Sequence, residues 1–174
     1  DLTLTNLNIS NTSTAIQIGN STNVHISKIN VSNSYNGVMI TNSNNVLIEN
    51  GSGCGNWAHG CELYNTSNST FNNVTLNRNG RGIAYWGGNH VIYKNSIFQY
   101  NGGGGMFQTT NTTFTNISFI ENKGDGLVIT EDNVVVEKST FIRNGQGFVN
   151  YAAVNSYHIL NTTFVDNIIG IYTG

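Results

Sequence analysis

Proline is absent from the sequence, and only 9% of its 174 residues are charged. Soluble domains ordinarily carry about 25% charged residues, so this surface must consist mainly of neutral polar groups. Seven Lys and Arg stand against nine Asp and Glu, and this balance offers no basic surface for nucleic acid. No apolar run approaches the roughly 18 residues that a membrane-spanning helix needs, so no membrane span is predicted.

Cysteine is nearly absent too, since the sequence contains only Cys54 and Cys61. Because the two are close in sequence, we expect a disulfide that closes one short turn, with Trp57 covering it. Free thiols are the alternative, which a cytosolic location would favour. The sequence starts at Asp1 without Met, which fits a processed protein or part of a longer one.

Asparagine is the abundant residue, with 31 copies, and 20 glycines accompany it. The hydrophobic fraction of 38% is too high for a disordered polar tract. Eleven Asn-x-Ser/Thr tripeptides are possible glycan acceptors. Their asparagines are Asn8, Asn11, Asn20, Asn30, Asn50, Asn65, Asn68, Asn73, Asn111, Asn116 and Asn161. Such tripeptides also arise by chance in this composition, but with the cysteines they predict an extracellular or cell-surface glycoprotein.

One pattern recurs along the whole chain. An asparagine returns at a nearly constant spacing, at Asn11, Asn33, Asn56, Asn79, Asn101, Asn122, Asn144 and Asn167. A glycine follows three or four residues later in all but the first repeat, at Gly37, Gly60, Gly82, Gly105, Gly126, Gly147 and Gly170. A large apolar residue stands three residues before the later asparagines, at Leu76, Phe98, Phe119, Phe141 and Phe164. In the first two repeats this residue lies one position nearer to the asparagine, at Ile9 and Val31.

Short alternating stretches such as NVVVE and NVLIE lie between these positions and predict strands, because Gly, Asn and β-branched residues disfavour a helix. If each repeat is one coil, successive coils stack about 4.8 Å apart and equivalent residues fall on one another. The phenylalanines are then expected to stack inside the molecule, and the asparagines to form an amide ladder. The glycine is expected to supply the positive φ of the turn.

The pattern N-x-V-x-I … F-x-x-N-x-x-G-[ILV] resembles the repeats of right-handed parallel β-helices in the pectin-lyase-like and NosD-like group. The resemblance implies an all-β fold, in which residues 1–174 form a single-domain solenoid of about eight coils, each of about 21–23 residues. That group includes polysaccharide lyases and hydrolases, phage tailspikes, adhesins and surface-layer proteins. The resemblance therefore indicates the fold and leaves the function open.

A polysaccharide lyase or hydrolase on this scaffold would need acidic residues on neighbouring coils, about 22 positions apart. The acidic residues between Asp125 and Glu137 have no carboxylate at that spacing. The four histidines fall in different columns or distant coils, so neither a metal site nor another cofactor is predicted. One charged column contains Arg78, Tyr100, Glu121, Arg143 and Asp166, with alternating signs from Glu121 onward, and is interpreted as a ladder of surface ion pairs.

A second column consists of the residue between the two inward apolar positions of each repeat, such as Gln17 between Ile16 and Ile18. This residue should face outward, and from the fourth repeat onward it is apolar. Exposed apolar stripes mark interfaces, so its members are interface candidates: Phe107, Val128, Val149 and Tyr172. The alternative is a change of register in the fifth and seventh repeats, where Gln108 and Asn150 would otherwise face inward. Neither end of the chain shows a polar cap, which predicts either a longer β-helix or end-to-end stacking of subunits.

The leading hypothesis is a non-enzymatic extracellular structural glycoprotein, a β-helical rod in a filament, sheath, surface layer or adhesin. It would self-associate end to end or laterally, and surface glycans are possible ligands. The alternative hypothesis is a carbohydrate-active enzyme or a polysaccharide-binding module, which the resemblance also supports.

Overall fold

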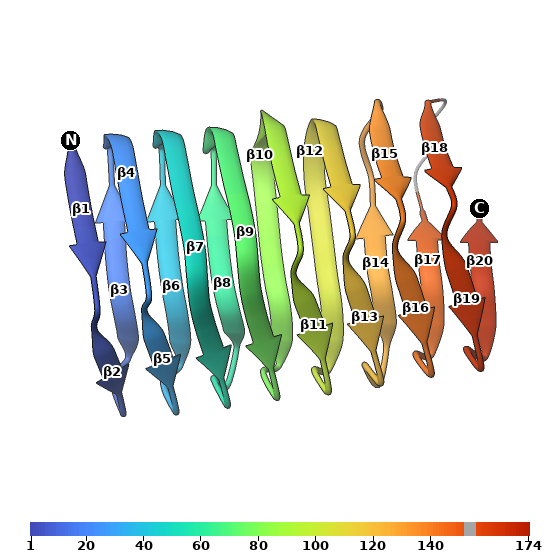
Figure 1. Ribbon diagram of the computed structural model, residues 1–174, viewed down its shortest axis with the longest axis horizontal. Helices are drawn as coiled ribbons and strands as arrows, with labels where there is room; N and C mark the ends of the chain where they lie inside the picture. Colours follow the sequence, from blue (N-terminus) through green and yellow to red (C-terminus); the bar gives the residue numbers. More distant parts are fainter. Residues whose placement is uncertain (152–155) are drawn as a thin grey trace.

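The computed structural model describes residues 1–151 and 156–174, and it confirms the all-β parallel β-helix. The chain winds through about eight coils, and strands pair in parallel with their equivalents on the next coil (Figure 1). Each coil has three faces, which we call A, B and C in chain order. Among the described residues, no helix is long and apolar enough to cross a membrane.

The strands are divided among the three faces as follows. Face A contains β1 (Leu2–Thr5), β4 (Thr22–Ser27), the first parts of β7 (Asn44–Cys54) and β9 (Ser67–Asn77), the last parts of β10 (Arg81–Lys94) and β12 (Gly103–Thr115), β15 (Val134–Glu137) and β18 (Tyr157–Leu160). Face B contains β2 (Asn8–Ser10), β5 (Asn30–Ser32), the ends of β7 and β9, β11 (Ile97–Gln99), β13 (Ser118–Ile120), β16 (Thr140–Ile142) and β19 (Thr163–Val165). Face C contains β3 (Thr14–Gly19), β6 (Asn36–Thr41), β8 (His59–Tyr64), the first parts of β10 and β12, β14 (Asp125–Ile129), β17 (Gln146–Asn150) and β20 (Ile169–Thr173).

The predicted phenylalanine column is confirmed on the inner side of face B. The rings of Phe98, Phe119, Phe141 and Phe164 stack with centroid distances of 5.1, 4.8 and 4.7 Å and nearly parallel planes. The first three of these side chains are at most 1% exposed. Identical residues meet here because the strands are parallel and in register from coil to coil.

The amide ladder is confirmed from the third coil onward, at the turn between faces B and C. Asn101 is representative: its Oδ1 accepts hydrogen bonds from the backbone N–H of Asn79 at 2.9 Å and from the Nδ2 of Asn79 at 3.1 Å. Its own Nδ2 donates to Oδ1 of Asn122 and to the backbone carbonyl of Leu76, both at 3.0 Å. The side chains thus satisfy backbone groups that the turn removes from water.

In the first two coils the ladder runs through Thr12 and Ser34, so the predicted positions Asn11 and Asn33 are wrong by one residue. Ser34 donates its backbone N–H to Oδ1 of Asn56 at 3.1 Å, and Thr12 donates its own to the Ser34 hydroxyl at 3.3 Å. Asn11 and Asn33 instead occupy the turn position just before the ladder, where φ is 58° and 51°.

Positive φ also explains the abundance of asparagine. Of the 24 non-glycine residues with positive φ in the described part of the chain, 16 are asparagines, which tolerate this conformation better than most residues. The expectation that the repeated glycines supply it is wrong. Gly82 lies where the coil bends, and a Cβ there would be 2.5 Å from the carbonyl oxygen of Gly104. The repeated glycine is therefore required by the close approach of successive coils, and in the fifth coil Gly104 takes this place instead of Gly105.

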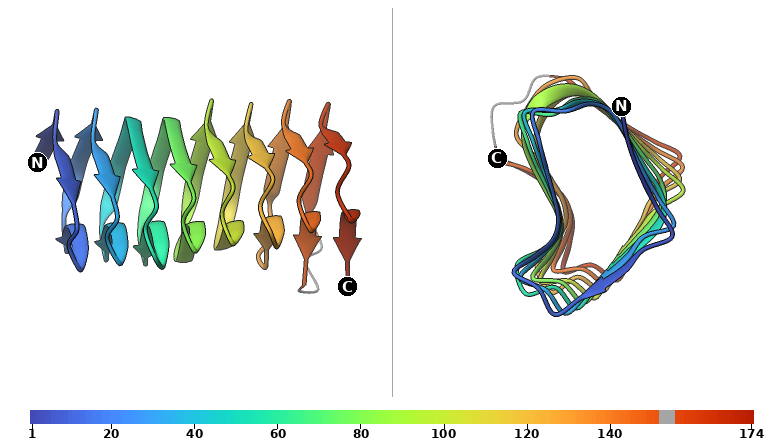
Figure 2. Two further views of the ribbon diagram at one scale, coloured as in Figure 1. Left: turned by 90° about the horizontal axis from the view of Figure 1, so that it is seen from below. Right: turned by 90° about the vertical axis from the view of Figure 1, so that its left-hand side faces the viewer.

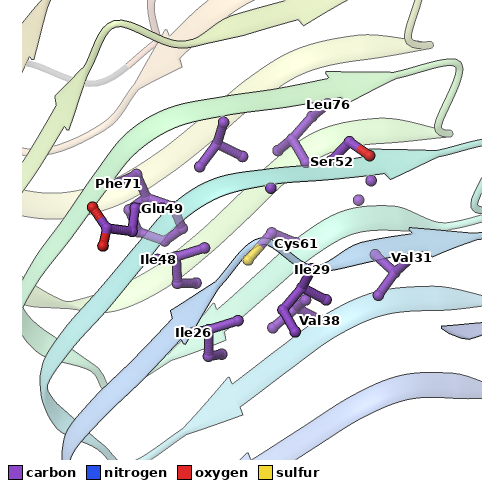
Figure 3. A pocket seen from close by; sticks show the side chains of 14 residues that line it. Ile26, Ile29, Val31, Val38, Ile48, Glu49, Ser52, Cys61, Phe71 and Leu76 are labelled. Atoms are coloured by element: carbon purple, nitrogen blue, oxygen red, sulfur yellow. The ribbon is translucent and has the colours of Figure 1, made fainter. Parts of the chain in front are cut away.

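One position of the inner face B column has no side chain. Gly53 lies between Val31 and Leu76 in the register, and an apolar cavity of about 30 Å³ remains beside it. Figure 3 shows Cys61 and Ile48 among the side chains around this cavity. A void lined in this way stays dry, so it weakens the packing of the third coil.

The outline of the coil is not symmetric. In the end-on view of Figure 2, the face formed by β3 and its equivalents bends inward toward the axis. The side view in the same figure shows the two termini at opposite ends of the solenoid. The outer side of face C is therefore a concave strip that runs along the molecule. Side chains on a concave strip lie close together, so this is where distant residues can form a site.

Candidate functional site on the concave face

A file of polar side chains runs across the concave face, one from each of several coils. Successive members are Asn36, His59 and Arg81, and then Asp125 and Gln146. Each lies one residue before the repeated glycine, and a Cβ added to that glycine would point toward the interior. Strand alternation then directs this file to the outer side of the sheet.

His59, Glu62 and Asn36 form the polar part of the site nearest to the N-terminus. Oε2 of Glu62 accepts a hydrogen bond of 3.0 Å from Nδ2 of Asn36 and lies 3.5 Å from Nδ1 of His59. The second contact is an electrostatic one, because it is not aligned as a hydrogen bond. Burial lowers the pKa of His59, and Arg81 acts in the same direction, while Glu62 opposes both. The imidazole is thus held neutral at pH 7.

Arg81 extends along the file toward the C-terminal coils. Gly103 pairs with Arg81 on the next coil, and a Cβ on Gly103 would lie 3.3 Å from Nε of Arg81. The guanidinium reaches the sulfur of Met106 at 3.2 Å. Burial raises the pKa of Asp125, and the positive charge of Arg81 offsets part of that effect. Gly103 therefore makes room for a cation between a histidine and a carboxyl group.

Aromatic side chains border the file on the side of the next turn. The ring centroids of Tyr64 and Trp86 are 5.6 Å apart, and those of His59 and Trp86 are 5.7 Å apart in an edge-on arrangement. Tyr64 is about half exposed. Trp86 is partly buried, and an aromatic pair of this kind beside hydrogen-bonding groups is suited to the apolar faces and hydroxyls of a sugar.

Three polar atoms of the file are buried without a hydrogen-bond partner among the described residues. They are Oδ1 of Asn36, Nδ1 of His59 and Oε1 of Gln146. Buried polar groups are nearly always satisfied, and each exception calls for a reason such as a ligand or a water. Among the described residues, no group of three or more His, Cys, Asp or Glu could hold a metal ion. Two of the three atoms are amide oxygens, which can accept hydrogen bonds from a polar ligand.

The predicted disulfide is wrong, because the structure leaves Cys54 and Cys61 as free thiols. Gly53 faces the interior, so strand alternation turns Cys54 outward, where it pairs in register with Ser32 and Asn77. Cys61 is inward and 3% exposed in the core. The two thiols point to opposite sides of the coil wall.

The interface candidates divide into three groups. Phe107 was predicted to face outward, but it is 1% exposed in the core and packs edge-on against Phe114 with centroids 4.9 Å apart. Val128 and Val149 do face the outer side of face C, yet the concave strip leaves them only 4% and 0% exposed. Tyr172 is 39% exposed and contacts Tyr151. These four residues therefore do not form the exposed apolar stripe of the prediction.

All eleven predicted glycan acceptors have exposed asparagines. Nine of them occupy turn positions with positive φ, and only Asn8 and Asn30 do not. The predicted ion-pair ladder is confirmed where Nε of Arg143 donates to Oε1 of Glu121 at 2.9 Å.

Sequence reasoning missed the site because it compared acidic residues only with other acidic residues. His59 and Arg81 are separated by one full repeat and pair in register on adjacent coils, and this spacing was available as a signal. The concave bend that brings Glu62 and Trp86 beside them has no counterpart in the repeat pattern.

Comparison with known proteins agrees with this architecture. The structure is similar to a periplasmic alginate epimerase, AlgG, with a TM-score of 0.79 and 12% identity over 88% of this chain and 43% of that one. It is also similar to PfbA, a surface adhesin of Streptococcus pneumoniae, with a TM-score of 0.63 and 13% identity over 97% of this chain and 61% of that one. A third similar structure is ORF18 of Geobacillus virus E2, with a TM-score of 0.53 and 12% identity over 90% of this chain and 50% of that one.

At these identities the similarity concerns the fold alone, and the chain spans less than half the length of the epimerase. A comparison with curated protein sequences finds no match. The model of the right-handed β-helix region matches residues 1–107 and 54–174, which together cover the whole sequence. The chain belongs to the right-handed β-helix family.

Proposed function

We propose that this chain is the rod of an extracellular or cell-surface protein and that its concave face binds a polysaccharide without cleaving it. The observation that carries the proposal is the file from Asn36 to Gln146, with buried polar atoms that have no hydrogen-bond partner among the described residues. The periplasmic and cell-surface location of two similar structures supports the proposed location.

A linear ligand suits this face because the file crosses several coils in a straight line. Asn36, Glu62 and Gln146 offer hydrogen-bonding groups to sugar hydroxyls, and Tyr64 with Trp86 offers aromatic surface. A bound polysaccharide would give the amide oxygens of Asn36 and Gln146 hydrogen-bond partners. Each buried polar group that lacks a partner costs about 1–3 kcal/mol.

The test is binding of the chain to a panel of immobilised polysaccharides. Trp86→Ala should weaken binding at least about fivefold, as expected when an aromatic contact of about 1 kcal/mol is lost. Ile92→Ala is the matched control, since Ile92 is 45% exposed on face A. Equal binding by the two variants, or no binding by the unmodified chain, would contradict the proposal.

A second candidate function is chemistry on a uronate polysaccharide, because a neutral histidine lies beside a cation. His59 could take the proton from the carbon that carries a sugar carboxylate, while Arg81 stabilises the charge as the electron pair of the broken C–H bond moves into that carboxylate. The pair would then either take up a proton again or expel the linked sugar, and the two side chains leave adjacent coils in register. Turnover of uronate polymers should then be lost in His59→Gln. It should remain in His25→Gln, which alters the other His–Glu pair, 3.0 Å apart on face A. Binding without turnover would exclude this candidate.

A further inference from the structure

A row of exposed aromatic and cationic side chains lies on the turn between faces B and C, beside the concave face. Trp57 is 78% exposed, and its ring centroid is 5.5 Å from that of Tyr35 on the preceding coil. On the following coils, the guanidinium of Arg78 lies 5.8 Å from the centre of the Tyr100 ring. Trp, Tyr and Arg are the residues that most often dominate binding energy at surfaces.

A hollow of about 380 Å³ opens in this row, with Trp57 and Lys123 at its two ends. Its floor includes Gly80 and Gly102, which must be glycines because a Cβ would lie 2.4 Å from the carbonyl oxygen of Trp57 or 2.3 Å from that of Gly80. Close stacking of the coils thus leaves no side chain at Gly80 and Gly102, which lie between the large side chains of Trp57, Arg78 and Tyr100. The volume is in the range of small-molecule sites, about 300–1,000 Å³.

The hollow is positively charged, unlike the next one along the same turn. Arg78 and Lys123 line it, and neither has an acidic partner among the described residues. In the next hollow Arg143 is paired with Glu121, and Asp166 is close by. Lys123 lines that hollow as well, but Glu121 and Asp166 balance the two cations there, so only the first of the two hollows combines uncompensated cations with an exposed indole.

We propose that the hollow formed by Trp57, Arg78, Tyr100 and Lys123 binds an acidic sugar residue. The indole of Trp57 covers the apolar face of the ring, and the carboxylate or sulfate of the sugar is held between Arg78 and Lys123. The row is one turn wide, which suits a linear chain, whereas a protein partner needs about 800 Å² on each side. This inference rests on the proposed function, since it names the charge of the polysaccharide.

The test is calorimetric titration with three oligosaccharides of equal length, one carboxylated, one sulfated and one neutral. The double variant Arg78→Asn with Lys123→Gln should weaken binding of the acidic probe about tenfold or more and leave the neutral probe unchanged. Asn is used because Arg78 has a φ of 54°, and Arg143→Asn, at a φ of 51°, is the matched control that should change nothing. Trp57→Ala should weaken binding of both kinds of probe.

The outcomes separate the two proposals. Preference for the carboxylated or for the sulfated probe identifies which acidic sugar is bound. Acidic binding that survives the double variant but is lost in Trp86→Ala would overturn this inference and leave the concave-face proposal standing. If no oligosaccharide binds the unmodified chain, both are wrong.

Discussion

Removal of one rung from the amide ladder should destabilise the protein more than the loss of any surface asparagine. Asn101 is fully buried and takes part in four hydrogen bonds through its side chain. In Asn101→Ala the backbone N–H of Asn79 and the carbonyl of Leu76 lose the partners that the side chain supplies. The other two groups keep one partner each, since Nδ2 of Asn79 still donates to Gly53 and Oδ1 of Asn122 still accepts from the Asn101 backbone.

The magnitude follows mainly from the backbone N–H of Asn79, which is left without a partner, because the carbonyl of Leu76 lies in β9 and stays within the ladder that pairs β9 with β11. A buried unsatisfied group costs about 1–3 kcal/mol, so Asn101→Ala should lower the free energy of unfolding by about 1–3 kcal/mol. Asn30→Ala is the matched control, because Asn30 also bonds the neighbouring coils, at 3.0 and 2.8 Å, but is exposed. Water replaces those bonds, so the control should change stability by at most about 0.5 kcal/mol.

Urea unfolding followed by circular dichroism measures both variants. Asn167→Ala extends the series, since Asn167 has the same kind of bonds to Asn144 and Phe141 but is only half-buried, and its cost should be intermediate. Equal losses in Asn101→Ala and Asn30→Ala would refute the reasoning that burial, rather than bond number, sets the cost. If Asn101→Ala fails to fold, the comparison of Asn167→Ala with Asn30→Ala decides the same question.

Three further predictions concern the thiols, the histidine of the concave face and the glycan acceptors. A thiol reagent should modify Cys54 in the folded protein and Cys61 only after unfolding, because burial encloses Cys61 and raises its pKa. If neither cysteine reacts in denaturant, the two form a disulfide and this prediction is wrong. The lowered pKa of His59 means that the unfolded state binds its proton more readily, so stability should fall as pH drops below about 6.5. His59→Gln should flatten that slope, and an unchanged slope would contradict it. In a secretory host, glycans should favour Asn8, Asn20, Asn50, Asn111 and Asn161, whose Nδ2 atoms donate no hydrogen bond among the described residues. Asn30, Asn68, Asn73 and Asn116 donate theirs to an asparagine of the preceding coil at 2.8–3.0 Å and should be poorer acceptors; glycopeptide mass spectrometry tests this ranking.

End-to-end or lateral self-association stays a prediction. Light scattering at rising protein concentration measures it, and a constant monomer mass would count against a filament.

The sequence by itself determined the fold, because a nearly constant repeat length forces equivalent residues to stack. Phe98, Phe119, Phe141 and Phe164 could be assigned to one inner column from their spacing alone. The amide ladder followed from the same spacing, except where Thr12 and Ser34 replace asparagine and the register could not be read. Register is the point at which repeat reasoning fails, since a shift of one residue reverses the side that each side chain faces.

Only the tertiary structure decided which surface can act as a site. The separation of Cys54 from Cys61 depends on strand alternation through Gly53, and the inward position of Phe107 depends on the register of one coil. The bend of face C brings Glu62 and Trp86 beside His59, and Gly103 leaves room for Arg81. Periodicity specifies which residues stack along the axis, whereas contacts around the circumference depend on the shape of the coil, which the spacing of repeats does not contain.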